Sequence, residues 1–300
     1  MRIVVAGSHG LIGSALVARL TEQGHDVVRL VRRAPSADDE VAWDPDEGRL
    51  DGGALVGADA VVNVTGVSAA SRPLTPARKQ EVVRSRLRTT ALLARTLAAR
   101  TDGPRTLLQG SAIGAYGDRG DAVLTEGEPR GAGTFFAELV RRWEGATAPA
   151  EAAGVRVVHL RTGIVLSPRG GALGRMLPLV RLGLAGPFGS GRQFWSWITL
   201  DDEVRAIEHL LTADVRGPVN LVAEPARNAD VVAALAEQWH RPAFVRVPAW
   251  ALRLVLGDFS QEVLGSVRAI PAALAATGFE HEHPEIETAA AWLRSQLRSR

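Results

Sequence analysis

The chain has 300 residues, of which 46% are hydrophobic and 23% are charged, and it contains no cysteine. A chain of this length and composition can bury a large core, so we expect a globular protein rather than a disordered one. The missing cysteines exclude disulfides, zinc–thiolate sites and thiol catalysis, and they fit the cytoplasm. No apolar run reaches the length of a membrane span. The N-terminus leads straight into a strand, so we expect no signal peptide.

The charge balance argues against a nucleic-acid partner. The sequence pI is about 9.8, but the formal net charge is only +2. The chain has a single lysine, Lys79, and a single tyrosine, Tyr116, so few groups titrate between histidine and arginine and the pI is pushed upward. The arginines are spread along the chain among acidic residues. This pattern is typical of a mixed solvated surface and not of a stripe that follows phosphates.

Strand-like and helix-like runs alternate over the first 165 residues. Short β-branched or apolar runs predict strands, and longer amphipathic runs predict helices between them. Strands are predicted at 2–7, 26–33, 58–66, 105–112 and 155–167, and helices at 11–24, 79–100 and 135–146. Such alternation favours βαβ units, a parallel sheet and helices on both of its faces. The predicted fold class is therefore α/β, with a doubly wound parallel sheet.

The pattern changes after residue 167. The segment 168–197 is rich in glycine and aromatic residues and is expected to leave the sheet as an irregular stretch. A helix at 201–213 and a short strand at 218–222 follow, and the tail from about 228 is mostly helical, with a turn at 241–248. We therefore expect a nucleotide-binding domain over 1–166, completed by about 198–222. A smaller C-terminal α/β cap domain would comprise 167–197 and 223–300.

Three glycines stand between the first strand and the first helix, at positions 7, 10 and 13. At this place Gly7 allows a sharp turn, Gly10 lets the backbone approach a pyrophosphate, and Gly13 lets the helix pack closely on the strand. The free N–H groups and the positive dipole end of the helix then favour the phosphates. Three glycines alone are a weak signal, but a strand before them and a helix after them favour a dinucleotide site.

The end of the second strand indicates which dinucleotide binds. An NAD site usually has an acidic residue here, which binds the ribose 2′-hydroxyl. This strand ends in Arg32 and Arg33 instead. Guanidinium groups bind phosphate oxygens in a forked geometry, so the pair suits the 2′-phosphate of NADP. The alternative is that both are ordinary surface arginines. We predict NADP as the cofactor.

Several further motifs carry a family resemblance. They include "GSHGLIGSAL" at 7–16, "NVTG" at 63–66, "SRLRTT" at 85–90, "SAIGAYG" at 111–117, "RTGIVLS" at 161–167, "PFGSGRQFWSWITLDD" at 187–202 and "IPAALAATGF" at 270–279. Together they resemble the extended short-chain dehydrogenase/reductase superfamily over nearly the whole chain. The sequence is most similar to a branch that is often labelled nucleoside-diphosphate-sugar epimerase and has a distinctive C-terminal domain.

The resemblance implies a Rossmann domain that binds NADP and a smaller substrate domain. It implies that the cofactor is lined by the glycine loop, the end of the second strand, the loop at 64–65, the long helix and the last strand. These residues are Gly7, Gly10, Leu11, Ile12, Gly13, Arg32, Arg33, Val64, Thr65, Glu81, Arg86 and Val165. Arg86 could pair with phosphate, or it could form an ion pair with Glu81. The chain departs from its branch at Arg72 and Leu74, where an aromatic residue is usual.

The superfamily's catalytic residues are missing. In these enzymes a Tyr-x-x-x-Lys pair on one helix face, helped by a serine or threonine, transfers the substrate proton. One tyrosine at 116 and one lysine at 79 cannot form that motif. Alignment on Glu144 places the tyrosine position at Phe136 and the lysine position at Val140, and the serine position falls on Ala112. Ser111 and Tyr116 are the remaining candidates for a proton source, with a structural role as the alternative.

Two other clusters have weaker interpretations. The run "EHEHPE" at 280–285 could offer two histidines to a metal, but no third ligand has a fixed spacing, so a solvated segment is favoured and no metal is predicted. The run "FWSW" at 194–197 with Gln193 could form the wall of a substrate cleft, or it could pack in a core where two domains meet.

Two classes of function remain open. The first is an NADP-dependent oxidoreductase or epimerase-like enzyme that acts on an unidentified small molecule. The second is a non-catalytic NADP-binding sensor or partner-binding protein. The intact glycine loop suits both, the missing catalytic residues favour the second, and the large C-terminal region favours the first. We expect the enzyme, as a monomer or homodimer with a small-molecule substrate and with no nucleic-acid or membrane partner.

Overall fold

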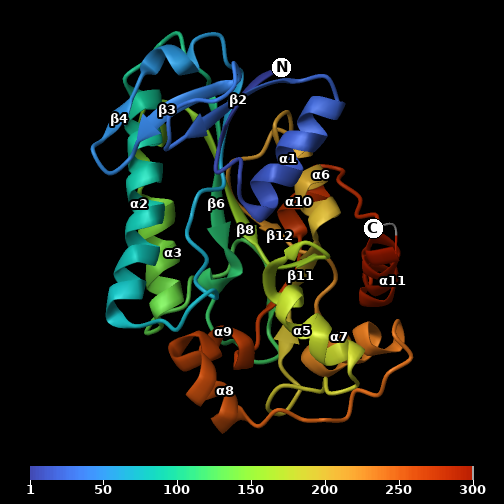
Figure 1. Ribbon diagram of the computed structural model, residues 1–300. Coiled ribbons are helices and arrows are strands. Elements are labelled where there is room, and N and C mark those ends of the chain that lie inside the picture. The colour runs from blue at the N-terminus through green and yellow to red at the C-terminus, as the bar shows by residue number, and fades with distance from the viewer. Residues whose placement is uncertain (299–300) are drawn as a thin grey trace.

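One large sheet forms the centre of the computed structural model, which describes residues 1–298 (Figure 1). Its strand order is β12-β8-β6-β5-β1-β2-β3-β4, and every pairing is parallel except that of β3 with β4. The strands are β1 (Arg2–Ala6), β2 (Asp26–Val31), β3 (Glu40–Asp44), β4 (Arg49–Leu50), β5 (Ala60–Asn63), β6 (Thr106–Ala112), β8 (Arg156–Thr162) and β12 (Gly217–Leu221).

Helices cover both faces of this sheet, because each central strand is apolar on both sides. In β1, Ile3 and Val5 join the core cluster under α1 and α6, whereas Val4 and Ala6 join the cluster under α2 and α4. Figure 1 shows α1, α6 and α10 on one side and α2 and α3 on the other. The helices are α1 (Leu11–Glu22), α2 (Pro76–Ala98), α3 (Phe135–Gly145), α4 (Ala148–Ala152), α6 (Leu200–Leu210) and α10 (Ala272–Ala276). The doubly wound fold is confirmed.

Threonine caps determine where the two helices nearest the predicted catalytic region begin. The Thr75 side chain accepts a hydrogen bond from the Arg78 N–H at 3.2 Å, and Pro76 occupies the first turn. Helix α2 therefore begins three residues before the predicted position 79, because a hydroxyl acceptor and a proline favour a helix start. Thr134 caps α3 in the same way through the Ala137 N–H.

The predicted strand at 155–167 is in fact two strands. It breaks at Gly163, where a Cβ atom would lie 2.7 Å from the Ser196 carbonyl oxygen. β8 stays in the large sheet, while β9 (Ile164–Ser167) turns away and pairs with β11 (Trp197–Thr199). The sequence analysis did not anticipate β3 and β4, which extend the sheet at its other edge.

The remaining elements form a smaller, mostly helical region at the carboxyl end of the sheet (Figure 1). The predicted irregular stretch at 168–197 contains a helix, α5, so that prediction was wrong in part; the helical tail is confirmed. Apart from η1 (Gly52–Leu55), which packs beside the large sheet under α2, these elements are η2 (Ile113–Ala115), β7 (Val123–Leu124), α5 (Gly171–Arg181), β10 (Phe194–Trp195), β13 (Ala226–Arg227), α7 (Asn228–Glu237), α8 (Ala249–Leu256), η3 (Gly257–Phe259), α9 (Ser260–Leu264), β14 (Arg268–Ala269) and α11 (Ile286–Arg298).

The domain boundaries near 166 and 222 stay a prediction, and the departure of β9 from the sheet is compatible with the first of them. Within the described residues, every helix is too short or too polar to cross a membrane.

Candidate functional site

The glycine turn after β1 is packed against the end of β5. Gly7 has a φ of +91°, and a Cβ atom there would lie 2.8 Å from the Val64 carbonyl carbon. A Cβ on Gly13 would lie 2.1 Å from the Gly7 carbonyl oxygen. The fold itself therefore needs glycine at both positions, one for its left-handed backbone and one for the close approach of α1.

Gly10 is different from the other two. Its backbone angles, φ −76° and ψ 173°, suit any residue, and a Cβ there would meet only the Gly7 carbonyl oxygen, at 3.3 Å. It stands directly before α1, whose first N–H groups are free at the helix end. A Cβ at this point would crowd one backbone oxygen and meet no other atom within 4 Å, so the fold constrains position 10 less than positions 7 and 13. The prediction that a pyrophosphate lies in front of Gly10 fits this place.

The loop after β5 is held rigidly beside this turn. The Thr65 hydroxyl donates to the Asn63 carboxamide oxygen at 2.6 Å and lies 2.8 Å from the Thr89 hydroxyl on α2. The Asn63 amide in turn donates to Gln109 on β6 at 2.9 Å. Val64 and Thr65 are thus fixed at the carboxyl edge of the sheet, where the resemblance implied that they line the cofactor.

Arg32 and Arg33, at the end of β2, differ in whether they have an acidic partner. Both Arg33 guanidinium nitrogens donate to the Glu40 carboxylate, at 2.7 and 2.6 Å. The Arg33 hydrogen bonds, with those from Ser36, lower the pKa of Glu40 to about 2, so the pair is charged at neutral pH. Arg32 is exposed and makes no hydrogen bond or ion pair with any described residue. Arg32 alone is therefore free to meet a 2′-phosphate.

Arg86 has no acidic partner in the described part of the chain. Glu81 pairs with Arg78 at 2.5 Å, so the expected alternative of an Arg86–Glu81 pair is not formed. Arg86 instead donates to the Val67 carbonyl oxygen at 3.0 Å and stacks 5.0 Å from the Trp143 ring centroid. Burial, helped by nearby Arg78, lowers its pKa to about 10. Its guanidinium lies over Gly66, at the end of the loop that begins with Val64.

The remaining cofactor candidates meet at the start of α5. A Cβ on Gly171 would lie 3.3 Å from both the Leu11 side chain and the Val165 carbonyl oxygen. Leu11 and Val165 are therefore neighbours, as a shared pocket requires. Ile12 is half-buried and packs against the core beneath α1.

Helix α3 carries apolar groups at the two positions where alignment on Glu144 predicts the superfamily's proton-transfer pair. Phe136 is 8% exposed and Val140 is 1% exposed. Phe136 packs against Leu74 and meets Phe259 of η3 edge-on, with the ring centroids 5.8 Å apart. Its Cβ also lies 3.3 Å from the point where a Cβ on Gly114 would stand. Phe136 is thus at the carboxyl end of β6, close to Ala112, and it moves no proton.

Ser111 and Tyr116 belong to a buried charged network. The Ser111 hydroxyl donates to Glu144 at 2.7 Å, and the fully buried Tyr116 hydroxyl donates to Asn220 at 2.8 Å and accepts from Arg161 at 3.0 Å. Arg161 also binds both oxygens of Glu144, at 2.9 and 3.1 Å. Burial raises the pKa of Tyr116 despite Arg161. These contacts favour the structural role for both residues, because each hydroxyl already has its partners and faces the protein interior.

The tryptophans of "FWSW" lie in a core and not in an open cleft. Trp195 is 5% exposed and Trp197 is fully buried, in the cluster that joins α5, α7 and α11. The Trp195 indole N–H donates to the Val263 carbonyl oxygen of α9 at 3.0 Å, and the Gln193 amide donates to the Phe188 carbonyl oxygen at 2.9 Å. This motif therefore holds the cap together, which is the packing alternative of the two interpretations.

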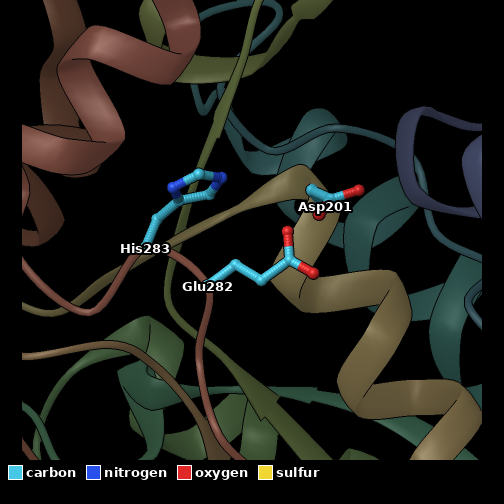
Figure 2. A group of neighbouring side chains, drawn as sticks. All are labelled: Asp201, Glu282 and His283. Carbon is cyan, nitrogen blue, oxygen red and sulfur yellow. The ribbon is translucent and has the colours of Figure 1, made fainter.

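One group of side chains could approach a metal ion. The side chains of Asp201, Glu282 and His283 gather in one place (Figure 2). Their ligand atoms lie within 4.8 Å of one another. Glu282 already pairs with Arg205 at 3.2 Å, and burial, followed by the charges of Glu282 and Asp202, raises the pKa of Asp201. The site would bind a cation weakly, because Arg205 neutralises Glu282 and Asp201 resists ionisation. We therefore assign no metal to it.

One acidic group at the carboxyl end of β6 is not expected from the sequence. Glu262 on α9 places its Oε2 atom 3.0 Å from the point where a Cβ on Gly114 would stand. Burial raises its pKa to about 7, and it makes no hydrogen bond or ion pair with any described residue. No sequence signal marks it, because it comes from the C-terminal region and has no motif of its own.

Comparison with known proteins agrees with this geometry. Residues 3–222 match the model of the NAD dependent epimerase/dehydratase family, and residues 247–293 match a domain of unknown function. The chain belongs to the NAD-dependent epimerase/dehydratase family. Within the family it is 45% identical to an epimerase family protein of Mycobacterium bovis over 95% of this chain and 94% of that protein. It is 36% identical to the human epimerase family protein SDR39U1 over 96% and 98% of the two chains.

Solved structures of this family extend the likeness to three dimensions. The crystal structure of human SDR39U1 with NADPH has a TM-score of 0.88 and 32% identity, covering 98% of this chain and 99% of that one. A nucleoside-diphosphate sugar epimerase from Corynebacterium glutamicum has a TM-score of 0.79 and 36% identity, covering 98% of this chain and 58% of that one. The family resemblance noted in the sequence is thus confirmed.

Proposed function

We propose that this protein is an NADP-dependent oxidoreductase or epimerase-like enzyme that acts on a small molecule. The observation that carries the proposal is Gly10, whose bare backbone the fold does not need and a pyrophosphate would need. The N-terminus of α1 follows Gly10 directly, Val64 and Thr65 pack against Gly7 of the same turn, and Leu11 and Val165 both border Gly171. The glycine loop and the late strand would hold the two ends of the same cofactor.

The preference for NADP rests on Arg32. The neighbouring Arg33 is engaged by Glu40, so it serves to neutralise an acid that would otherwise repel a 2′-phosphate. Arg32 is left without a partner among the described residues and is exposed beside the end of β2. That edge of the sheet is where a Rossmann fold places the adenine ribose. Human SDR39U1 was crystallised with NADPH, which supports the same choice.

The cofactor would supply a hydride, and the chain would position the reactants. Because the adenine ribose would lie toward β2, the nicotinamide would lie in the opposite direction, over β5 and β6. Phe136 and Val140 would make an apolar wall there. The alternative is a protein that binds NADP without turnover. Phe136 and Val140, which cannot transfer a proton, favour that alternative. Glu262, whose carboxyl lies at the predicted nicotinamide end, favours the enzyme.

Calorimetric titration with NADPH and NADH tests the proposal. Wild type should bind NADPH more tightly, and Arg32→Ala should lose about 1.5–3 kcal/mol of NADPH binding, roughly one to two decades in affinity. NADH binding should be unchanged, because NADH has no 2′-phosphate.

Arg95→Ala is a matched control, since Arg95 is an exposed arginine on the distant part of α2. It should leave both affinities unchanged. Equal affinities of wild type for the two cofactors would show that Arg32 does not read the 2′-phosphate. A wild type that binds neither cofactor would refute the proposed function itself.

A further inference from the structure

A carboxyl group from the C-terminal region lies at the end of β6, beside the position predicted for the missing tyrosine. The Glu262 Oε2 atom and the Phe136 Cβ atom lie 3.0 and 3.3 Å from one point, the place where a Cβ on Gly114 would stand. A Cβ at position 114 would crowd both groups, so the glycine suits the close approach of the carboxyl to the backbone of η2. Glu262 and Phe136 therefore line the same small space, although they come from opposite ends of the chain.

The helix that carries Glu262 is held in place from several sides. The Val263 carbonyl oxygen accepts hydrogen bonds from the Trp195 indole and, at 3.4 Å, from the Gln193 amide. Two residues beyond α9, Ser266 donates to the Gly120 carbonyl oxygen at 2.6 Å. Phe259, just before α9, packs on Phe136. A short helix fixed at both ends gives the carboxyl a defined position, which a proton-transfer group requires.

No charge compensates the Glu262 carboxylate. Asp258 on η3 is paired with Lys79, and Asp118 accepts from the Ser266 and Gly120 N–H groups. Elsewhere in this part of the molecule, Tyr116 is bonded to Asn220 and Arg161, and Glu138 on α3 is paired with Arg141 at the surface. Burial thus raises the pKa of Glu262 to about 7, where a carboxyl can both give and take a proton at neutral pH.

We propose that Glu262 is the proton-transfer group of this site and takes the role of the tyrosine that Phe136 replaces. The inference rests on the proposed function, because it needs a nicotinamide over the ends of β5 and β6. With this inference, the C-terminal region supplies the proton-transfer group in addition to covering the substrate. The apolar Phe136 side chain then has a purpose, since an apolar neighbour disfavours the charged form of the carboxyl.

The substrate class is a carbonyl compound or the corresponding secondary alcohol. In reduction, hydride from NADPH adds to the carbonyl carbon, and Glu262 donates its proton to the carbonyl oxygen. The products are the alcohol, NADP⁺ and the Glu262 carboxylate, which regains a proton from water. In the oxidative direction the carboxylate accepts the hydroxyl proton while the carbon loses hydride to NADP⁺, so atoms and electrons balance both ways.

Relative affinities for NADP⁺ and NADPH test the proposal without a known substrate. The nicotinamide ring is positive only in NADP⁺, so a Glu262 carboxylate should favour that form. The ratio of Kd for NADP⁺ to Kd for NADPH, measured from pH 5.5 to 8.5, should fall about fivefold to tenfold as the pH rises through about 7. Titration of the 2′-phosphate cancels in this ratio because both forms carry it.

Glu262→Gln should make the ratio independent of pH while both cofactors still bind. Glu237→Gln, an exposed glutamate at the end of α7, should behave like wild type. A flat wild-type ratio, or a Glu262→Gln variant that keeps the wild-type pH dependence, would overturn the proposal. Failure of wild type to bind either cofactor would instead overturn the proposed function, and this inference with it.

Proton transfer itself is followed as NADPH oxidation with a panel of aldehydes, ketones and quinones. On any compound that wild type reduces, Glu262→Gln should be about 10²–10⁴-fold slower, with its NADPH affinity within about threefold of wild type. Equal rates of NADPH oxidation by wild type and Glu262→Gln would overturn the proton-transfer role of Glu262. The affinity ratio decides the matter whether or not the panel contains a good substrate.

Discussion

Glu144 illustrates how single residues hold the centre of this molecule. Its side chain and that of Arg161 are 1% and 2% exposed, and Ser111 and Arg130 also donate to it. Burial alone would raise the pKa of Glu144, but the nearby His159 and Arg161 hold it well below its usual range. Removing one partner of such a pair leaves the other charge buried and unpaired, which costs far more than a surface ion pair contributes.

We therefore predict that Glu144→Gln lowers the free energy of unfolding by about 3–5 kcal/mol in urea titrations at pH 7. Because the folded-state pKa of Glu144 lies below the unfolded value of about 4.3, its contribution is present above that pH. It should be lost as the pH falls toward the folded-state pKa, so wild type should lose more stability than the variant between pH 5 and 3. Glu138→Gln, which breaks only the exposed pair with Arg141, should cost at most about 1 kcal/mol.

At the scale of elements, the glycine turn and α1 combine two kinds of glycine. Gly13 is required by the packing of α1 on the turn, since a Cβ would lie 2.1 Å from the Gly7 carbonyl oxygen. Gly10 has an ordinary backbone conformation, and a Cβ there would meet only the Gly7 carbonyl oxygen, at 3.3 Å. We therefore expect stability and cofactor binding to depend on different positions of one short motif.

Gly10→Val and Gly13→Ala should separate these two contributions. Gly10→Val should fold with a loss of at most about 1 kcal/mol, because valine is only a poorer helix cap than glycine, but it should show no thermal stabilisation by NADPH. At an NADPH concentration of 100 times Kd, the free energy of unfolding of the wild type should rise by about 2.7 kcal/mol. Gly13→Ala should lower the melting temperature even without cofactor. Full NADPH stabilisation of Gly10→Val would mean that the phosphates bind elsewhere.

For the molecule as a whole, the contact between the sheet and the C-terminal region matters most near Phe136. This ring packs on Leu74 and Val82 below and meets Phe259 of η3 above. The C-terminal region also reaches the first domain through β14, which pairs with β7 in a separate two-stranded sheet, and through Asn220 of β12, whose amide donates to the Ile270 carbonyl oxygen. Phe136, at the predicted position of the missing tyrosine, is therefore part of the packing between the two regions.

Phe136→Ala should lower the free energy of unfolding by about 3–5 kcal/mol, because it leaves a cavity under η3. Phe135→Ala should cost less, since Phe135 is only half-buried. Denaturant titration of both variants measures the difference. A cost for Phe136→Ala no greater than that for Phe135→Ala would contradict the packing described for this ring.

The sequence by itself determined the local and compositional features of this protein. Strand and helix periods repeat within a few residues, so they identified the parallel sheet, and the glycine spacing predicts a cofactor-binding turn after β1. The absence of a Tyr-x-x-x-Lys pair follows from counting one tyrosine and one lysine. Helix α5 and the break at Gly163 were not predicted, because both depend on contacts with distant segments such as Ser196.

Only the tertiary structure decided which polar side chains are paired within the protein and which remain available to a ligand. The parallel pairing of β2 with β3 sets Arg29 opposite Glu40, so that Glu40 engages Arg33 and leaves Arg32 exposed. The crossover order of the sheet brings Asn220 to Tyr116 and Glu144 to Ser111, which occupies both hydroxyls. Glu262 reaches Gly114 only because α9 folds back over the end of β6. Partners far apart along the chain leave no periodic trace in it, so burial and charge at this site depend on the fold.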